Sequence, residues 1–466
     1  MIPTNRALGY VIAILAIVVL GLVFELRRNE LIASAVFTGL IAGALLFWRF
    51  RLAFAFIGIA GMLGLGLIDV PTLIEFAGLD IILFLIGMMI VVGYLEENRF
   101  FEYLIERIVR FTGANGRRLI IVLMLMAGLS AALVDEVTSI LFMTATVLNL
   151  TARYRVNPFP FVIMMVFATN VGSSATVIGN PVGIMIALRG ELSFSDFLRW
   201  ATPISIAVLF GTVYLCLRYF RDPITELSFK MQRQPLAEIE PEETTFMLAP
   251  PPGFRKSVTL FGLTILGLVF HRQLEQALAL ERNSMLVGTS LLAAGVALLL
   301  EYSKARELVE RRVDWWTLSF FLILFASVGT LEFVGVTRLL ARGVFFITGS
   351  NPTLLFLLFS GVVGGLSAVI DNVLAVATFI PVVNDLGALG VSTFILWWGV
   401  LFGGTLVGRL TPIGSTANIV AVGILERQRQ QHVTLGQWLR PGAYVTFPTY
   451  ALALALLYLQ APLMPF

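Results

Sequence analysis

A polar, glycine-punctuated stretch interrupts an otherwise apolar segment of the chain and limits what that segment can become. Residues 168–181 read ATNVGSSATVIGNP, in the middle of an apolar run from about 159 to 188. Two glycines and a proline weaken a helical hydrogen-bond ladder, so this run cannot form a plain membrane helix. Unwound backbone at membrane depth is tolerated where it lines a protein-enclosed cavity, which is where secondary transporters bind their cargo. The candidate ligands here are Asn170, Ser173, Ser174, Thr176 and Asn180.

A second stretch of this kind lies at 403–418, GGTLVGRLTPIGSTAN, inside an apolar run from 392 to 425. Proline at a helix break frees carbonyls one turn earlier, and the half-helix that follows points its positive N-terminal end inward. Two interrupted helices in corresponding places therefore predict one shared site. The second stretch contributes Arg409, Thr411, Ser415, Thr416 and Asn418 as candidates. For any single serine or threonine, the alternative is helix packing by small residues.

The composition places the chain in a membrane. Of 466 residues, 58% are hydrophobic and 13% charged, and the mean hydropathy is +0.91, well above the balance of a soluble domain. The net charge of +3 is small, and Lys and Arg lie at the ends of the apolar segments. This placement indicates that they set the orientation of the membrane spans and do not bind nucleic acid. The single cysteine, Cys216, excludes an internal disulfide, and His271 and His432 are far apart. We therefore expect no metal site and no cofactor.

The apolar runs predict an all-α integral membrane fold with about eleven transmembrane helices. Two further apolar stretches, 118–152 and 352–385, are about 35 residues each, too long for one span and short for two spans with a turn. Both have polar residues near the centre, which predicts re-entrant hairpins packed inside protein. The predicted spans are 8–26, 31–48, 52–70, 79–97, 159–188, 199–219, 257–271, 283–300, 314–334, 392–425 and 440–460.

An internal repeat with an offset of about 236 residues relates the two halves. LVDEV at 133–137 aligns with VIDNV at 369–373, and TVIG at 176–179 aligns with TPIG at 411–414. Five spans and one hairpin per half require opposite orientations, so we predict an inverted repeat. The predicted divisions are an extra N-terminal helix (1–30), a first repeat (31–221), a cytoplasmic linker (222–256) and a second repeat (257–466).

The Lys and Arg bias of the short loops predicts the orientation. The linker 222–256 and its flanks are rich in Lys and Arg, which places them in the cytoplasm, the N-terminus inside and the C-terminus outside a cell membrane. Hairpin 118–152 then opens from the cytoplasm and hairpin 352–385 from the outside. Two amphipathic runs, Phe100–Thr112 and Val336–Ile347, are expected to be helices at the membrane interface.

Two adjacent acids at the tip of the first hairpin, Asp135 and Glu136, are the strongest functional signal. An ionisable group near the bilayer centre costs about 2.5 to 3.5 kcal/mol on insertion scales, so its presence indicates a function. Adjacent carboxylates repel, which makes one of them a candidate to exchange a proton near neutral pH. The alternative is that they cap the hairpin turn at a helix N-terminus. Thr138 follows in the same turn, and Asp371 and Asn372 occupy the mirrored tip.

Arg409 is the second signal, because it lies at the centre of its segment, where snorkelling to either interface would be strained. A fixed guanidinium beside a broken helix is suited to an anionic substrate, or to the place that a sodium ion would take in a more symmetric relative. The alternative is an internal salt bridge to Asp371 or Asp135 that only neutralises buried charge.

The hairpin pair DE/DN, together with the breaks GSSATVIGNP and LTPIGS, resembles the ion transporter superfamily. The nearest likeness is the branch with arsenite efflux permeases, sodium/proton antiporters of the NhaD type, the pigmentation P protein and plant silicon effluxers. The resemblance runs from about Leu52 to the end and implies scaffold and transport subdomains, an elevator movement and commonly a homodimer. Citrate and dicarboxylate relatives typically carry SNT at both hairpin tips, where this chain has DEVT and DNVL. Arsenite permeases carry a basic residue at the place of Arg409, which favours proton over sodium coupling.

The leading functional hypothesis is a secondary active transporter that moves a small anion or an oxyanion-forming solute, such as arsenite or antimonite, coupled to protons. A cation/proton antiporter is the first alternative, and a citrate or dicarboxylate transporter the second. No HExxH or GxGD motif indicates an intramembrane enzyme, and an inverted repeat fits alternating access better than a channel. The expected partners are a small ion substrate, a coupling ion, the lipid bilayer and a second copy of the chain, with no nucleic acid.

Overall fold

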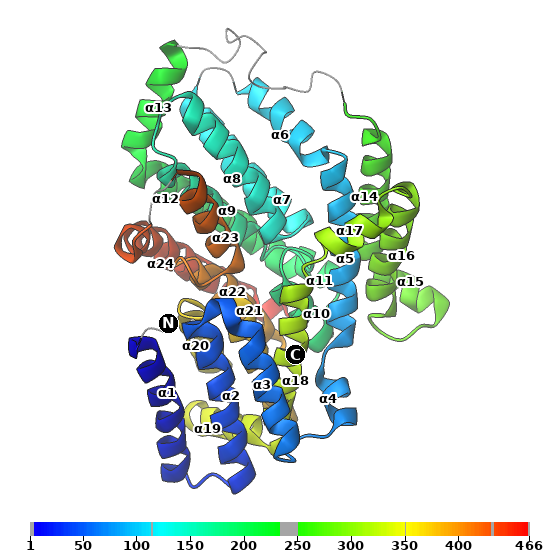
Figure 1. Ribbon diagram of the computed structural model, residues 1–466, viewed down its shortest axis with the longest axis vertical. Coiled ribbons are helices and arrows are strands. Elements are labelled where there is room, and N and C mark those ends of the chain that lie inside the picture. Colours follow the sequence, from blue (N-terminus) through cyan, green and yellow to red (C-terminus); the bar gives the residue numbers. More distant parts are fainter. Residues whose placement is uncertain (1–3, 113–114, 234–249, 350, 430–432, 465–466) are drawn as a thin grey trace. The chain divides into compact units, whose positions relative to one another are not determined.

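The computed structural model describes residues 4–112, 115–233, 250–349, 351–429 and 433–464 (Figure 1). Within these ranges the chain folds into helices and contains no β-strand. The predicted all-α membrane architecture is therefore confirmed, and the helices fall close to the predicted apolar runs. The chain divides into two compact units, each assembled from separate stretches of sequence.

The first unit combines residues 1–83, 314–355 and 377–396. Within it, α18 packs against α2, α3 and α4, while α1 packs against α2. Arg51 is buried there at the start of α3; its Nη2 donates to Thr317 Oγ1 at 2.7 Å, and its guanidinium lies over the rings of Trp48 and Phe320. Its helices are α1 (Thr4–Val23), α2 (Arg28–Leu46), α3 (Arg51–Gly64), α4 (Val70–Phe76), α18 (Trp315–Val334) and α19 (Val336–Thr348).

The second unit combines residues 84–313, 356–376 and 397–466 and holds every candidate site residue. In it α9 packs against α7, α8 and α12, and α23 packs against α8 and α9. Its helices are α6 (Phe100–Phe111), α7 (Gly116–Leu133), α8 (Glu136–Arg153), α9 (Phe159–Gly172), α10 (Pro181–Arg189), α11 (Phe194–Asp196), α12 (Thr202–Tyr219), α13 (Arg221–Arg233), α14 (Phe254–Val269), α15 (His271–Leu278), α16 (Ser284–Leu300), α17 (Ala305–Arg312), α23 (Thr416–Arg429) and α24 (Leu435–Gln460). Four helices have residues in both units: α5 (Leu79–Glu97), α20 (Pro352–Ser367), α21 (Asn372–Ala388) and α22 (Phe394–Gly408).

Both predicted hairpins are pairs of helices that meet at the predicted acidic residues. Helices α7 and α8 pack together and are separated only by Val134 and Asp135, while α20 and α21 are separated by residues 368–371. Ser139 Oγ of α8 donates to the Ala127 carbonyl of α7 at 3.1 Å, which fixes the two arms near the tip. Helix α7 is by itself long and apolar enough to cross a membrane. Helix length therefore does not distinguish a full crossing from a re-entrant path, and the re-entrant path of each hairpin stays a prediction.

Both predicted breaks also occur. The run 159–188 forms α9 and α10 with 173–180 between them, and the run 392–425 forms α22 and α23 with 409–415 between them. One contact recurs at nearly the same offset in the two halves: Thr176 Oγ1 donates to the Ala132 carbonyl, and Thr411 Oγ1 donates to the Ala368 carbonyl at 2.6 Å. Each break is thereby tied to the hairpin of its own half. The opposite orientation of the halves stays a prediction.

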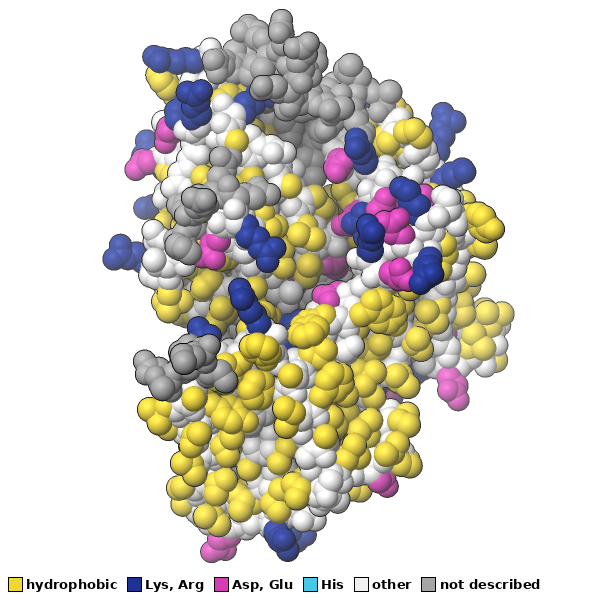
Figure 2. All heavy atoms as spheres, viewed as in Figure 1, with side chains coloured by type: hydrophobic (Ala, Val, Ile, Leu, Met, Phe, Trp, Pro, Cys, Tyr) yellow, Lys and Arg dark blue, Asp and Glu magenta, His cyan; other side chains and the backbone are white. Residues whose placement is uncertain are grey.

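Seven helices in the described ranges are long and apolar enough to span a membrane, or eight if the bent pair α14 and α15 is one span. Five more apolar helices are shorter, and the predicted total of eleven spans is not settled by these lengths. Exposed apolar side chains cover much of the surface in Figure 2, notably over α1 and α3, whereas charged side chains gather over α17. The protein is a multi-pass membrane protein.

Several elements lie outside the predicted spans. Helix α13 occupies the start of the predicted linker 222–256, of which 234–249 lies outside the described residues. Helices α4, α15 and α17 also lie largely outside the predicted spans, and each is too short to cross a membrane by itself. The two amphipathic runs are helical, as α6 and α19. The predicted domain boundaries remain predictions.

Close packing of α7 and α9 predicts the effect of one substitution. A Cβ added at Gly172 would overlap the Gly128 carbonyl of α7, whereas one added at Gly365 would meet no heavy atom within 4 Å. We expect Gly172→Ala to destabilise the protein by about 1–3 kcal/mol or more, because backbone cannot move aside as a flexible side chain can. Thermal unfolding of the purified protein in detergent measures this, with Gly365→Ala as the matched control. Equal melting temperatures for the two variants would contradict the close packing.

Candidate functional site

The carboxylate of Glu136 lies where the two halves of the sequence meet. Its side chain is 1% exposed. Ser173 Oγ, from the first break, donates to Glu136 Oε2 at 3.0 Å. Asn372 Nδ2, from the second hairpin tip, and Ser415 Oγ, from the second break, each lie 3.5 Å from Glu136 Oε1. One buried carboxylate is therefore surrounded by donors from three other polar segments.

Asp135 has a different role from its neighbour. It is the N-cap of α8, with extended backbone, and its Oδ1 accepts from the backbone N–H groups of Val137 at 2.7 Å and Thr138 at 2.9 Å. The capping role that the sequence left open is thus present for Asp135. Glu136, one residue later, is turned into the polar centre instead.

The second hairpin tip repeats this arrangement with different chemistry. Asp371 Oδ1 accepts from the Val373 backbone N–H at 3.0 Å, and its Oδ2 accepts from Thr416 Oγ1 at 2.8 Å. Asn372 stands at the position equivalent to Glu136 and is fully buried. The mirrored tip therefore offers an amide where the first tip offers a carboxylate.

The first break is held by Asn180, the N-cap of α10. Its Oδ1 accepts from the Gly183 N–H at 2.8 Å, and its Nδ2 donates to Ser173 Oγ at 2.9 Å. Asn180 thus orients the hydroxyl that binds Glu136. Ser174 points away from this centre, toward Ser205 Oγ at 3.0 Å, and Thr176 is used in its bond to the hairpin.

An asparagine pair joins the two broken helices. Asn170 Nδ2 donates to Asn418 Oδ1 at 2.9 Å, and Asn418 Nδ2 donates to the carbonyls of Gly408 at 3.1 Å and Thr411 at 2.7 Å. The carbonyls freed at the second break are therefore satisfied by a side chain. Asn170 Oδ1 is buried without a hydrogen-bond partner among the described residues.

The starts of four helices supply the groups around Glu136: α8, α10, α21 and α23. Each helix N-terminus carries roughly half a positive elementary charge. The carboxylates of Asp135 and Asp371 compensate α8 and α21, because they accept those helices' own N–H groups. Helices α10 and α23 have the neutral N-caps Asn180 and Ser415, and Asp371 Oδ2 also accepts from Thr416 Oγ1 in the first turn of α23. Glu136 thus lies among these helix starts and accepts from side chains, whereas Asp135 and Asp371 accept from backbone N–H groups.

Arg409 is separate from this acidic centre. Its guanidinium points between α12 and α24, where Nη1 donates to Thr212 Oγ1 at 3.2 Å and Nη2 donates to Thr449 Oγ1. The hydrogen-bond partners of its guanidinium within the described ranges are these two hydroxyls, and neither is a carboxylate. The salt bridge to Asp371 or Asp135, raised above as an alternative, is therefore wrong. Arg409 and the two aspartates hydrogen-bond to different groups.

The sequence analysis missed Thr212, Thr449 and Ser205, which complete the surroundings of Arg409 and Ser174. Each is a small hydroxyl residue in a mostly apolar helix, where small polar residues commonly serve packing. The sequence pattern does not distinguish these residues from hydroxyl residues that only pack between helices. Their contacts with Arg409 and Ser174 in the folded chain identify them.

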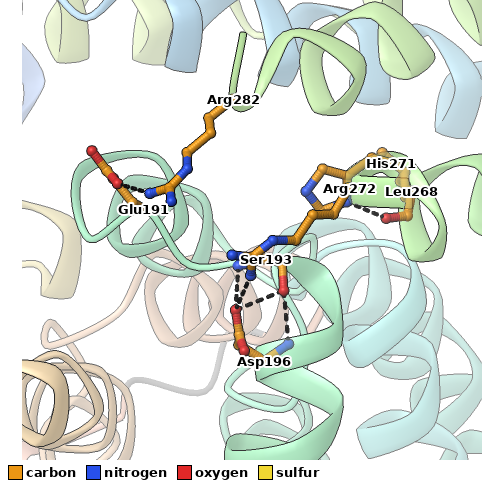
Figure 3. A network of polar contacts seen from close by, with 7 residues as sticks. All are labelled: Glu191, Ser193, Asp196, Leu268, His271, Arg272 and Arg282. Carbon is orange, nitrogen blue, oxygen red and sulfur yellow. Dashed lines mark hydrogen bonds and ion pairs between the residues drawn. The ribbon is translucent and has the colours of Figure 1, made fainter. Parts of the chain in front are cut away.

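Polar contacts also fix the far end of α10 (Figure 3). Asp196 Oδ2 accepts from Ser193 Oγ at 2.6 Å and lies 3.5 Å from Arg272 Nη1, while Arg282 pairs with Glu191. These contacts link the segment after α10 to α15 and to the loop between α15 and α16. The half-helix that begins at Asn180 is therefore anchored at both ends.

The capping geometry predicts how Asp135 responds to substitution. Asparagine keeps an acceptor oxygen at an N-cap, so Asp135→Asn should preserve the melting temperature, whereas Asp135→Ala should cost about 0.5–2 kcal/mol. Thermal unfolding in detergent separates the two. If both variants lose the same stability, the carboxylate charge and not the cap holds the hairpin tip.

Comparison with known proteins agrees with this architecture. The family profile described as "Citrate transporter" (CitMHS) matches residues 41–347 and 334–464. An uncharacterised transporter of Mycobacterium tuberculosis is 33% identical over 384 residues, covering 82% of this chain and 86% of that protein. The P protein of Homo sapiens is 26% identical over 474 residues, covering 85% of this chain and 56% of that protein.

A solved structure shares the fold. The crystal structure of the YdaH transporter of Alcanivorax borkumensis has a TM-score of 0.56 and 15% sequence identity, and covers 84% of this chain and 87% of that one. Its similarity concerns the fold alone. Together with the paired breaks and acidic hairpin tips, the family match shows that this chain is a membrane transporter that belongs to the citrate transporter family.

Proposed function

We propose that this protein is a proton-coupled secondary transporter of a small anion or an oxyanion-forming solute of the arsenite or antimonite type. The observation that carries the proposal is the position of Glu136, whose carboxylate accepts from Ser173 and faces Asn372 and Ser415 among four helix N-termini. Such a place favours one negative charge. The ionised carboxylate of Glu136 uses the donors that a substrate anion beside it would bind.

Protonation of Glu136 provides the coupling in this proposal. A proton bound to a carboxylate oxygen makes the side chain neutral and turns one oxygen into a donor. The hydroxyls of Ser173 and Ser415 and the amide of Asn372 then become available to an anion, and the positive ends of the neighbouring helices favour its binding. Proton and anion consequently load together, and the release of one promotes the release of the other.

The wider transport cycle is also part of the proposal. The resemblance to elevator transporters favours movement of the hairpins and broken helices as one body, in a homodimer of the cell membrane with the N-terminus in the cytoplasm. Citrate itself stays a weaker candidate, because neither hairpin tip carries the SNT sequence typical of citrate and dicarboxylate relatives.

A second candidate, cation/proton antiport, is favoured by one observation. No basic side chain of the described ranges contacts Glu136, and Arg409 hydrogen-bonds to threonines instead. A small cation would then compete with the proton for Glu136 and the neutral oxygens around it. The same ranges contain no cluster of three or more His, Cys, Asp or Glu side chains suited to a metal ion, so the competing cation would be an alkali ion.

Substitution of Glu136 by glutamine separates the two candidates. Glutamine resembles the protonated acid, so Glu136→Gln should abolish proton movement driven by an anion but retain exchange of that anion across the membrane. The measurement uses proteoliposomes with an internal pH dye and a labelled anion, challenged with arsenite, antimonite, phosphate and citrate, and separately with sodium and lithium.

The control for this experiment is Glu307→Gln. Glu307 lies in α17 and pairs with Arg311 at 2.8 Å at the exposed surface, so its loss should leave both readouts unchanged. A pH response to sodium or lithium alone, which Glu136→Gln removes, would contradict anion transport and establish the antiporter. Loss of anion exchange together with proton movement would contradict the proposed role of Glu136.

A further inference from the structure

The guanidinium of Arg409 is a buried positive charge without a carboxylate partner. The side chain is 0% exposed, and its contacts in the described ranges are with the hydroxyls of Thr212 and Thr449. A buried cation normally requires a paired anion, because transfer out of water costs several kcal/mol per ion. Neutral hydroxyls contribute dipoles but no opposite charge.

The helix that precedes Arg409 compensates only part of this charge. Helix α22 ends at Gly408, so its C-terminal carbonyls contribute roughly half a negative elementary charge near the guanidinium. Two of those carbonyls are already used, since the Leu410 N–H donates to Val407 and Asn418 Nδ2 donates to Gly408. A net positive potential therefore remains between α12 and α24.

Two donors at this place lack an acceptor among the described residues. Arg409 Nε is buried without a hydrogen-bond partner, and so is Thr446 Oγ1. Thr446 precedes Thr449 by three residues on α24, so both hydroxyls lie on the face of α24 that Arg409 contacts. Such orphaned buried donors are rare, and each requires an explanation.

We propose that Arg409 and Thr446 form a buried binding site for a small monovalent inorganic anion of chloride size. The anion accepts from Arg409 Nε and Thr446 Oγ1 and neutralises the guanidinium. The site has to be small because Arg409, Thr446 and the neighbouring Cys216 are all fully buried. It is distinct from the centre at Glu136 and does not depend on the proposed transport activity, since its anion is a resident counter-ion.

Chloride titration of the purified full-length protein tests this site. In detergent, sodium chloride replaces sodium gluconate at constant ionic strength while thermal unfolding is followed. We expect the melting temperature to rise and then saturate with chloride, because a ligand that binds only the folded state stabilises it. A second readout is fluorescence, since Trp438 Nε1 donates to the Arg409 carbonyl at 3.1 Å and Trp438→Phe assigns the signal.

Two variants and a control make the test specific. Thr446→Val should raise the half-saturating chloride concentration by about tenfold, the value of one hydrogen bond to a charged group. Arg409→Gln should remove the saturable response, while Arg306→Gln, an exposed arginine of α17, should retain it. If Arg409→Gln does not fold, Thr446→Val alone decides. No saturable rise in the parent, or an unchanged half-saturation in Thr446→Val, overturns the proposal.

Discussion

The structure depends on one constraint, the burial of a carboxylate at a point reached by both halves of the chain. Glu136 is 1% exposed, and its oxygens face donors from residues 37, 236 and 279 positions away. The donors are side chains of Ser173 at the first break, Asn372 at the second hairpin tip and Ser415 at the second break. The two breaks and two hairpin tips are therefore the features that make this charge tolerable inside a membrane protein.

The buried acids and the buried Arg409 lie apart from one another. The acids lie at helix starts, where positive helix ends solvate them, and Arg409 lies just after the C-terminus of α22, between α12 and α24. A direct ion pair between Arg409 and Glu136 would have left neither free to respond to a proton or an ion. In the proposed cycle this separation lets Glu136 change its charge while Arg409 keeps its own.

The sequence predicted the elements better than their contacts. Polar interruptions in apolar runs located both breaks, and the residue pairs Asp135-Glu136 and Asp371-Asn372 located the two hairpin tips, because such residues are too costly at membrane depth to occur without a reason. Helix lengths did not decide the number of spans or whether α7 crosses fully. The hydrogen-bond partners of Arg409 could not be predicted, because Thr212 and Thr449 lie far from it in the sequence and belong to no motif.

The central claim is that Glu136 takes up a proton when an anion binds beside it. Infrared difference spectroscopy of the purified protein, with and without a transported anion, measures this directly through the carbonyl stretch of a protonated carboxylic acid. The account predicts that the anion produces this band in the parent protein and not in Glu136→Gln. A band of equal strength in the variant, or none in the parent, would contradict it.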